Sequence, residues 1–252
     1  MSPSDLPPLD CHAHIAPDVT GPQIAALNGA IIFAMTRSPA EGRFAVRRSD
    51  PTILWGYGAH PGVASAVTAV TEDGIRRAAT EHVVIGEIGL DRKTALAPQL
   101  AALDLILDVC AGKPLLLSLH STGRAGNLLD ALTRRPHAGA ILHWFNGTRE
   151  QIDRAAALGC YFSVNAAMSD ERLAWIPRER LLPETDFPSS RRNTRARIPG
   201  DITFLEQRMS ELLHQPAAAV RNMWYANLAT LTQRTGVTPR LPAALRQLLD
   251  DC

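Results

Sequence analysis

Two histidines, His12 and His14, stand two residues apart in the segment Asp10–His14. In an extended strand, residues at this spacing point the same way, so both imidazoles face one side. Two neutral imidazoles on a rigid strand provide half of a binding site for a divalent metal ion. The two histidines could also lie close together in sequence by chance. A metal site needs further ligands from elsewhere in the chain.

A carboxylate lies inside the apolar run Val83–Leu90, where Glu87 is flanked by Gly86 and Gly89. A buried carboxylate is costly unless it is paired, hydrogen-bonded or bound to a cation. Glu87 could form an ion pair with an arginine in the interior. It could also bridge two metal ions, which an imidazole does not do here. The two glycines predict close packing around a fixed group.

Three more polar side chains end apolar runs: His120, His143 and Asp186. A single histidine at the end of a strand is more often a core or capping residue. Two of them on neighbouring strands, added to His12 and His14, favour metal ligands. We expect Asp186 to face the first strand, beside that first pair, where a carboxylate can hold one ion and accept a proton from an attacking water.

Eight short apolar runs recur along the chain, with helical patterns between them. The runs are Pro8–His14, Ala30–Thr36, Ile53–His60, Val83–Leu90, Pro114–His120, Gly139–Phe145, Tyr161–Asn165 and Leu181–Asp186, and the clearest helical patterns are Gln99–Ala111, Gly126–Arg134, Arg149–Leu158 and Ile202–Leu213. Uninterrupted runs fit parallel strands buried on both faces. The pattern predicts an α/β fold, a TIM-type (β/α)8 barrel forming a single domain over 1–252, with the metal-binding side chains at the carboxyl ends of the strands.

The composition is that of an ordinary soluble enzyme: 252 residues, 46% hydrophobic, 20% charged, with a formal net charge of +1. These values exclude global disorder and a protein that coats nucleic acid through bulk charge. The four cysteines form no CxxC pair, and no segment has the length of a signal peptide's apolar run or a membrane span, so we expect a cytoplasmic protein. Only Lys93 and Lys113 of the 26 basic residues are lysines. Arginine matches phosphate oxygens better than lysine does.

The chain resembles the TatD-like metal-dependent deoxyribonucleases of the amidohydrolase superfamily, from Asp10 to about Asn227. The matching elements are Asp10-x-His12-x-His14, Gly58-Ala59-His60-Pro61, Gly86-Glu87-Ile88-Gly89-Leu90-Asp91, His120, the segment His143–Gly147, and Glu184-Thr185-Asp186. The resemblance implies hydrolysis of phosphodiester bonds in DNA, as single strands or duplex ends. It also implies two divalent ions (Mg, Mn or Zn): His12, His14 and Asp186 hold one, His120 and His143 hold the other, and Glu87 bridges them.

Other residues are candidates for binding the substrate. His60 lies in the Gly-x-His-Pro element. We interpret it either as a residue that contacts the substrate or supports a metal ligand, or as a buried histidine that donates to a backbone carbonyl. Where the family usually has an aromatic residue after the glutamate element, this chain has Arg92. The segment Ser190–Pro199 departs from the family's pattern too.

Arginines in two segments could grip phosphates at the rim of the metal site, or could simply be solvated. They are Arg191, Arg192 and Arg195 after the eighth run, and Arg37, Arg43, Arg47 and Arg48 after the second. Trp144, Phe145 and Phe187 could stack on bases, or could pack in the interior.

Two further segments, Leu142–Gly147 and Leu158–Val164, resemble the TatD-family nucleases of Qat anti-phage systems. This resemblance implies a role in antiviral defence beside other proteins of a defence operon. Two alternatives stay open. One is a hydrolase of small lactones, amides or phosphoesters, because the fold hosts many reactions. The other is a defence-complex subunit that acts mainly by binding a partner, although no expected metal ligand is missing.

Overall fold

The computed structural model describes residues 6–189 and 191–250. Ser190, the first residue of the segment Ser190–Pro199, and Cys252, one of the four cysteines, lie outside the described residues. Its eight strands are parallel and pair in chain order. They are β1 (Leu9–Ala13), β2 (Ile31–Ala34), β3 (Ile53–Tyr57), β4 (Val84–Gly89), β5 (Leu116–His120), β6 (Ala140–His143), β7 (Tyr161–Val164) and β8 (Leu181–Pro183). Each lies inside one of the eight predicted runs.

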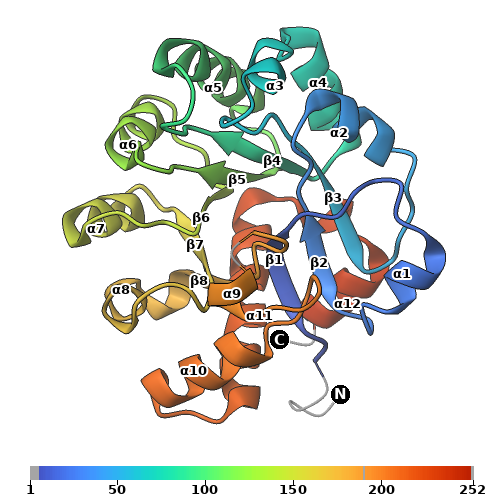
Figure 1. Cartoon of the computed structure of the whole chain (residues 1–252), viewed down its shortest axis with the longest axis vertical. Helices are drawn as coiled ribbons and strands as arrows, with labels where there is room; N and C mark the ends of the chain where they lie inside the picture. Colours follow the sequence, from blue (N-terminus) through green and yellow to red (C-terminus); the bar gives the residue numbers. More distant parts are fainter. Residues whose placement is uncertain (1–5, 190, 251–252) are drawn as a thin grey trace.

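The chain beyond β8 closes the barrel against β1. The amide of Asp186 donates to the carbonyl of His12 at 2.9 Å, and the amide of His14 donates to the carbonyl of Phe187 at 2.7 Å. The predicted TIM-type (β/α)8 barrel is therefore confirmed, and Figure 1 shows its helices arranged around the strands.

Helices follow the strands and cover their outer faces. They are α1 (Gly21–Ala25), α2 (Pro39–Ala45), α3 (Ala64–Thr68), α4 (Glu72–Glu81), α5 (Leu96–Cys110), α6 (Ala125–Arg134), α7 (Arg149–Ala157), α8 (Asp170–Trp175), α9 (Arg191–Thr194), α10 (Thr203–Leu213), α11 (Ala217–Thr235) and α12 (Ala243–Asp250). The four predicted helical patterns correspond to α5, α6, α7 and α10. Local sequence sets their starts: at α7, Thr148 and Gln151 form a reciprocal capping box.

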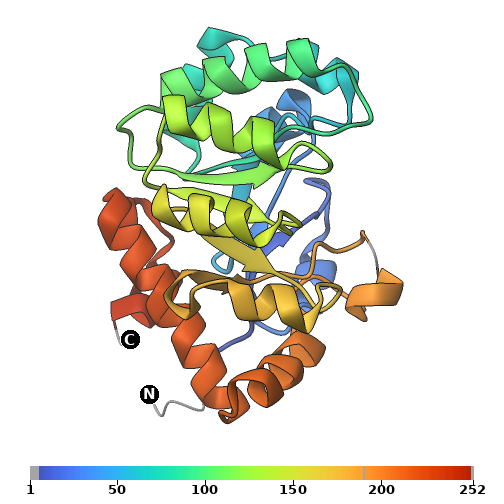
Figure 2. The same cartoon turned by 90° about the vertical axis from the view of Figure 1, so that its left-hand side faces the viewer.

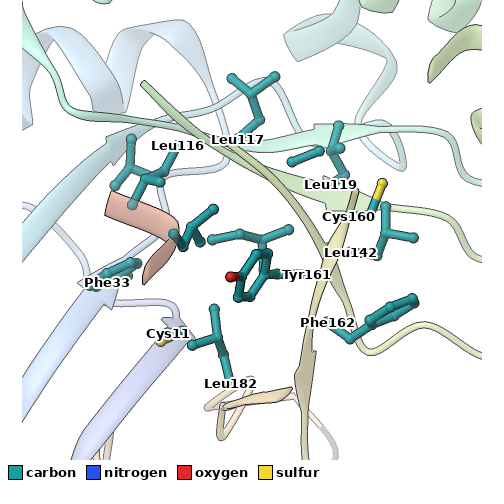
Figure 3. Packing of buried hydrophobic residues seen from close by; sticks show 14 of the residues in the cluster. Cys11, Phe33, Leu116, Leu117, Leu119, Leu142, Cys160, Tyr161, Phe162 and Leu182 are labelled. Carbon is teal, nitrogen blue, oxygen red and sulfur yellow. The ribbon is translucent and has the colours of Figure 1, made fainter. Parts of the chain in front are cut away.

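The strands are apolar on both faces because both faces are covered. Figure 3 shows Tyr161 in the barrel interior with Phe33, Leu116 and Leu182 around it, and each of these four side chains is at most 1% exposed. Among the described residues, no helix has the length and hydropathy needed to cross a bilayer.

The two ends of the barrel differ. Figure 2 shows the red helices α11 and α12 on the opposite side of the molecule from α9, in orange. Helix α11 packs against β1 and β8: Trp224 is fully buried, and the hydroxyl of Tyr225 donates to the carbonyl of Pro7 at 3.1 Å. The carboxyl ends of the strands, at the other end of the barrel, carry the polar groups.

Candidate metal centre

Six side chains predicted as metal ligands converge at the carboxyl ends of the strands. They come from β1 (His12), the residue after it (His14), β4 (Glu87), β5 (His120), β6 (His143) and the loop after β8 (Asp186). Together with His60 they form overlapping groups of three residues, and within each group the donor atoms lie within 4.8 Å of one another. Parallel strands bring residues distant in sequence to one edge of the barrel, as predicted.

One group of donor atoms surrounds Oε2 of Glu87. This oxygen is 3.8 Å from Nε2 of His12 and 3.3 Å from Nε2 of His14. Oδ1 of Asp186 completes the group, 3.8 Å from Nε2 of His12 and 3.6 Å from Nε2 of His14.

A second group surrounds the other oxygen of the same carboxylate. Oε1 of Glu87 is 2.6 Å from Nδ1 of His120 and 3.2 Å from Nε2 of His143. These two nitrogens are 3.1 Å apart. The carboxylate of Glu87 therefore faces a different set of donors with each oxygen.

The donors fit divalent cations. Two ligands about 2.1 Å from a tetrahedral ion are about 3.4 Å apart, which is close to the separations seen here. Nε2 of His12 and Oε2 of Glu87 are buried and have no hydrogen-bond partner among the described residues. Buried polar atoms without partners are rare in native proteins. A cation bound here would give both atoms a partner.

Each of the four histidines uses its second ring nitrogen for a supporting contact. Nδ1 of His12 is 2.7 Å from Oγ of Ser118, and Nδ1 of His14 is 3.0 Å from the carbonyl of Met35. Nε2 of His120 is 2.9 Å from Oδ2 of Asp91. Such contacts fix the tautomer and orientation of a ligating imidazole.

For His143 the supporting contact is a carboxylate. Its Nδ1 is 3.5 Å from Oε1 of Glu184. The hydroxyl of Ser163 and the side-chain amide of Asn165 both donate to Glu184, which is only 1% exposed. The sequence motifs contain Asp91 and Glu184, but nothing in their spacing singles them out from the ligands; only the fold does.

The electrostatics of the site are dominated by burial and by Glu87. Burial raises the pKa of Glu87, but the charge of His120 and the ring nitrogens of His120, His14 and His143 close to the carboxylate outweigh this effect and hold the pKa well below its usual range. Burial raises the pKa of Asp186 to about 7, against the opposing effect of His143. Glu87 is therefore the fixed negative charge of the cluster.

His60 lies at the edge of the cluster, with Nε2 3.5 Å from Oε2 of Glu87. Its Nδ1 accepts the amide hydrogen of Gly62 at 2.9 Å, so the ring proton of the neutral imidazole sits on Nε2. Burial lowers the pKa of His60 to about 4, which keeps the ring neutral at pH 7. The alternative expectation was that His60 donates to a backbone carbonyl, but its Nδ1 accepts a backbone amide hydrogen. His60 instead presents an N–H to the site.

A polar cavity of about 300 Å³ lies over the cluster. Arg37, Lys93, Trp144 and Asn146 contribute to its walls together with five of the six ligands. Of the four arginines expected after the second strand, Arg37 is the one that lines this cavity. Arg48 pairs with Asp50 at 2.8 Å and stacks on Trp55, in a different part of the surface.

The other predicted arginines lie outside the lining of this cavity. Arg92 is exposed, and Arg192 is exposed on α9. The guanidinium of Arg191 lies 5.6 Å from the Phe187 ring, and that of Arg195 lies 4.3 Å from the Phe204 ring. From the same loop, Ser189 reaches the cavity. Substrate contacts of these four arginines stay a prediction.

The aromatic candidates separate by burial. Trp144 lines the cavity, and Phe187 is half-buried. Phe145 is fully buried and packs against Phe162, with ring centroids 5.9 Å apart, so the expectation that it could stack on a base is wrong. The alternation of the chain after β6 turns Trp144 toward the site and Phe145 into the core.

A family model and individual relatives both match this chain, and they point to the same family. Residues 9–233 match the model of the TatD related DNase family. A protein named 3'-5' ssDNA/RNA exonuclease TatD from Escherichia coli (strain K12) is 31% identical over 235 residues, covering 82% of this chain and 88% of that protein. The protein of the same name from Edwardsiella piscicida is 35% identical over 184 residues, covering 65% of this chain and 69% of that protein.

Solved structures agree on the fold. A TatD homologue from Escherichia coli K12 superposes with a TM-score of 0.75 at 24% identity, over 88% of this chain and 96% of that chain. A TatD family hydrolase from Entamoeba histolytica gives a TM-score of 0.70 at 19% identity, over 88% and 97%. With the family model covering most of the chain, this protein belongs to the TatD related DNase family and is a metal-dependent hydrolase of ester bonds.

Proposed function

We propose that this protein is an exonuclease that removes nucleotides from single-stranded DNA with two divalent ions held by the cluster around Glu87. The observation that carries the proposal is the division of the Glu87 carboxylate, whose two oxygens face two separate sets of donors. His12, His14 and Asp186 would hold one ion, and His120 and His143 the other. When bound, such ions polarise a phosphate, neutralise its charge and supply a nucleophile at neutral pH.

The chain's own residues have distinct roles in this proposal. The carboxylate of Asp186 accepts the proton of the attacking water. The N–H of His60 and the guanidinium of Arg37 donate to the non-bridging oxygens of the scissile phosphate. The names of the relatives support a 3'-to-5' direction and a single-stranded substrate.

The test is release of nucleotides from end-labelled single-stranded and duplex DNA, with added Mg, Mn or Zn and with a chelator. We expect metal-dependent cleavage that disappears in Glu87→Ala and Asp186→Ala and persists in Asp153→Asn, a change of an exposed carboxylate on α7. No cleavage by metal-loaded wild-type protein would overturn the proposal. Hydrolysis of lactones, amides or small phosphoesters by the same preparation would then identify the alternative hydrolase.

We further propose that the enzyme works in the cytoplasm in anti-phage defence, with other proteins of a defence operon. The support is the resemblance of Leu142–Gly147 and Leu158–Val164 to Qat nucleases; the first segment carries His143 and the cavity residues Trp144 and Asn146. Cys11, Cys110 and Cys160 are unpaired, as in a reducing compartment. Plaque counts on cells carrying the operon should rise with Glu87→Ala. Unchanged protection would instead indicate a subunit that acts by binding a partner.

A further inference from the structure

A second, larger cavity of about 690 Å³ adjoins the polar cavity over the metal ligands. The two cavities share His14, Arg37, His60 and Ser189, so a bound molecule can extend from one into the other. The volume lies within the range of about 300–1,000 Å³ typical of small-molecule sites. We call this cavity the Phe44 pocket.

The Phe44 pocket differs from the metal cavity in its chemistry. Much of its wall is apolar, formed by Ile15, Ala16, Pro17, Met35, Ala40, Phe44 and Pro188. A polar phosphate gains nothing from such a wall, whereas a flat, mostly apolar ring does. The chemistry of the lining therefore suits a nucleobase.

Phe44 is the most exposed large hydrophobic side chain among the described residues, at 51%. It stands on α2, whose start is fixed by Ser38 accepting the amide hydrogen of Glu41 and whose other face buries Pro39, Gly42 and Ala45. The ring is thus held on a rigid element with a large part of its surface in solvent. Aromatic rings in this setting are stacking platforms for unpaired bases.

Charges around the Phe44 pocket favour one orientation of a nucleotide. Asp18 and Glu41 lie in its wall, and both repel a phosphate. Arg37 lines both cavities, at the passage between them, and its guanidinium has no hydrogen-bond or ion-pair partner among the residues 6–189 and 191–250. This distribution of charge suits a phosphate at Arg37 and a neutral base beyond it.

We propose that the Phe44 pocket binds the nucleobase of a nucleotide next to the scissile phosphate, with the base stacked on Phe44. The inference rests on the proposed nuclease function and adds the part of the substrate that is recognised. A base enters the pocket only when it is unpaired, so the site selects single strands and frayed ends over intact duplex.

The test uses a 5'-labelled single-stranded oligonucleotide and two copies of it, each with one abasic residue on either side of the scissile phosphate. We expect Phe44→Ala to lower kcat/KM on the full substrate about 5- to 150-fold, the range for loss of one stacked base. On one of the two abasic substrates the same variant should match wild type, because there is no base left to stack. Phe44→Trp should retain activity.

Val46→Ala is the matched control, because Val46 is 39% exposed and lines a different cavity. A Phe44→Ala loss that is equal on all three substrates, or no loss at all, would overturn the inference. Binding of a phosphorothioate oligonucleotide to the metal-loaded protein gives an independent readout: its Kd should rise by a similar factor in Phe44→Ala. If wild type cleaves none of the substrates, it is the nuclease proposal that fails.

Discussion

At the scale of single residues, Glu87 lies among the histidines of the candidate metal centre. Its carboxylate is 1% exposed and lies within 4 Å of nitrogen atoms from five histidines. Four of these histidines are oriented by a group that contacts their second ring nitrogen. For His120 this group is the carboxylate of Asp91, which also lines the cavity. The geometry of the candidate ligands therefore depends on supporting residues that are not themselves among the proposed ligands.

Asp91→Asn tests this support. The substitution keeps the shape of the side chain but removes the negative partner of His120, whose hydrogen bond lowers the pKa of Asp91 to about 2. We expect the affinity for Mn²⁺ or Zn²⁺ to fall about 10- to 100-fold, the usual effect of losing an outer partner of a metal-binding histidine. Competition with a chelator measures it. Asp153→Asn should leave the affinity unchanged, and an Asp91→Asn protein with wild-type affinity would contradict the assigned role.

At the scale of elements, close contact between β4 and β5 determines where Glu87 stands. A Cβ added at Gly86 would lie 2.7 Å from Cβ of Ser118 on β5 and 2.9 Å from Sδ of Met35. Ser118 in turn contacts His12. The glycine therefore lets β5 approach β4 closely enough for Ser118 to contact His12 below the candidate metal site.

Gly86→Ala should destabilise the protein by about 1–3 kcal/mol, as expected for overpacking a tight interior. The matched control is Gly126→Ala in α6, where the nearest atom to the added Cβ, Nε2 of Gln151, is 3.8 Å away. This second change should be neutral or should stabilise by about 0.5–1 kcal/mol. Denaturant unfolding gives both free energies. Equal stability of the two variants would show that the β4–β5 contact is looser than described.

The elements were predictable from sequence, but their contacts were not. Buried parallel strands are continuous apolar runs, so Val83–Leu90 and its seven counterparts stand out, and polar residues at their ends mark the site. The roles of Phe44, Lys93 and Asp91 could not be predicted, because they depend on which segments distant in sequence lie side by side. The arginines after the second strand show most clearly what the sequence does not predict. Charge alone does not distinguish Arg37, which lines the cavity, from Arg48, which pairs with Asp50.

At the scale of the whole molecule, Asp10 joins the first and last parts of the barrel. Its Oδ1 accepts the amide hydrogens of His12 and Thr185, and its Oδ2 accepts the hydroxyl of Thr185 at 2.6 Å and the amide of Gly200 at 2.8 Å. This carboxylate is fully buried. It holds β1 against the loop that carries Asp186, and so closes the barrel at the metal site.

Asp10→Asn should lower the free energy of unfolding by about 1–3 kcal/mol, because the amide group turns an acceptor into a donor opposite buried donors. Chemical denaturation measures the change. Asp153→Asn, at an exposed position, should stay within about 0.5 kcal/mol of wild type. An Asp10→Asn protein as stable as this control would mean that Asp10 does not hold the closure.

Metal binding should stabilise the whole fold, because the cluster gathers residues from four strands, the residue after β1 and the closing loop. At a metal concentration 100 times Kd, linkage gives about 2.7 kcal/mol. For a protein of this size that corresponds to a rise in Tm of about 5–10 °C over chelator-treated protein. Calorimetry with and without Mn²⁺ measures it. The rise should be lost in Glu87→Ala, and a rise that persists there would place the bound ions elsewhere.

The division of the Glu87 carboxylate between two ions is the central claim, and the number of ions per chain tests it most directly. Native mass spectrometry of protein equilibrated with Mn²⁺ or Zn²⁺ counts them. We predict two ions per chain in the wild type and at most one in Glu87→Ala, with two retained in Asp153→Asn. A wild-type protein that saturates at one ion, or a Glu87→Ala variant that still holds two, would contradict the bridged two-metal centre.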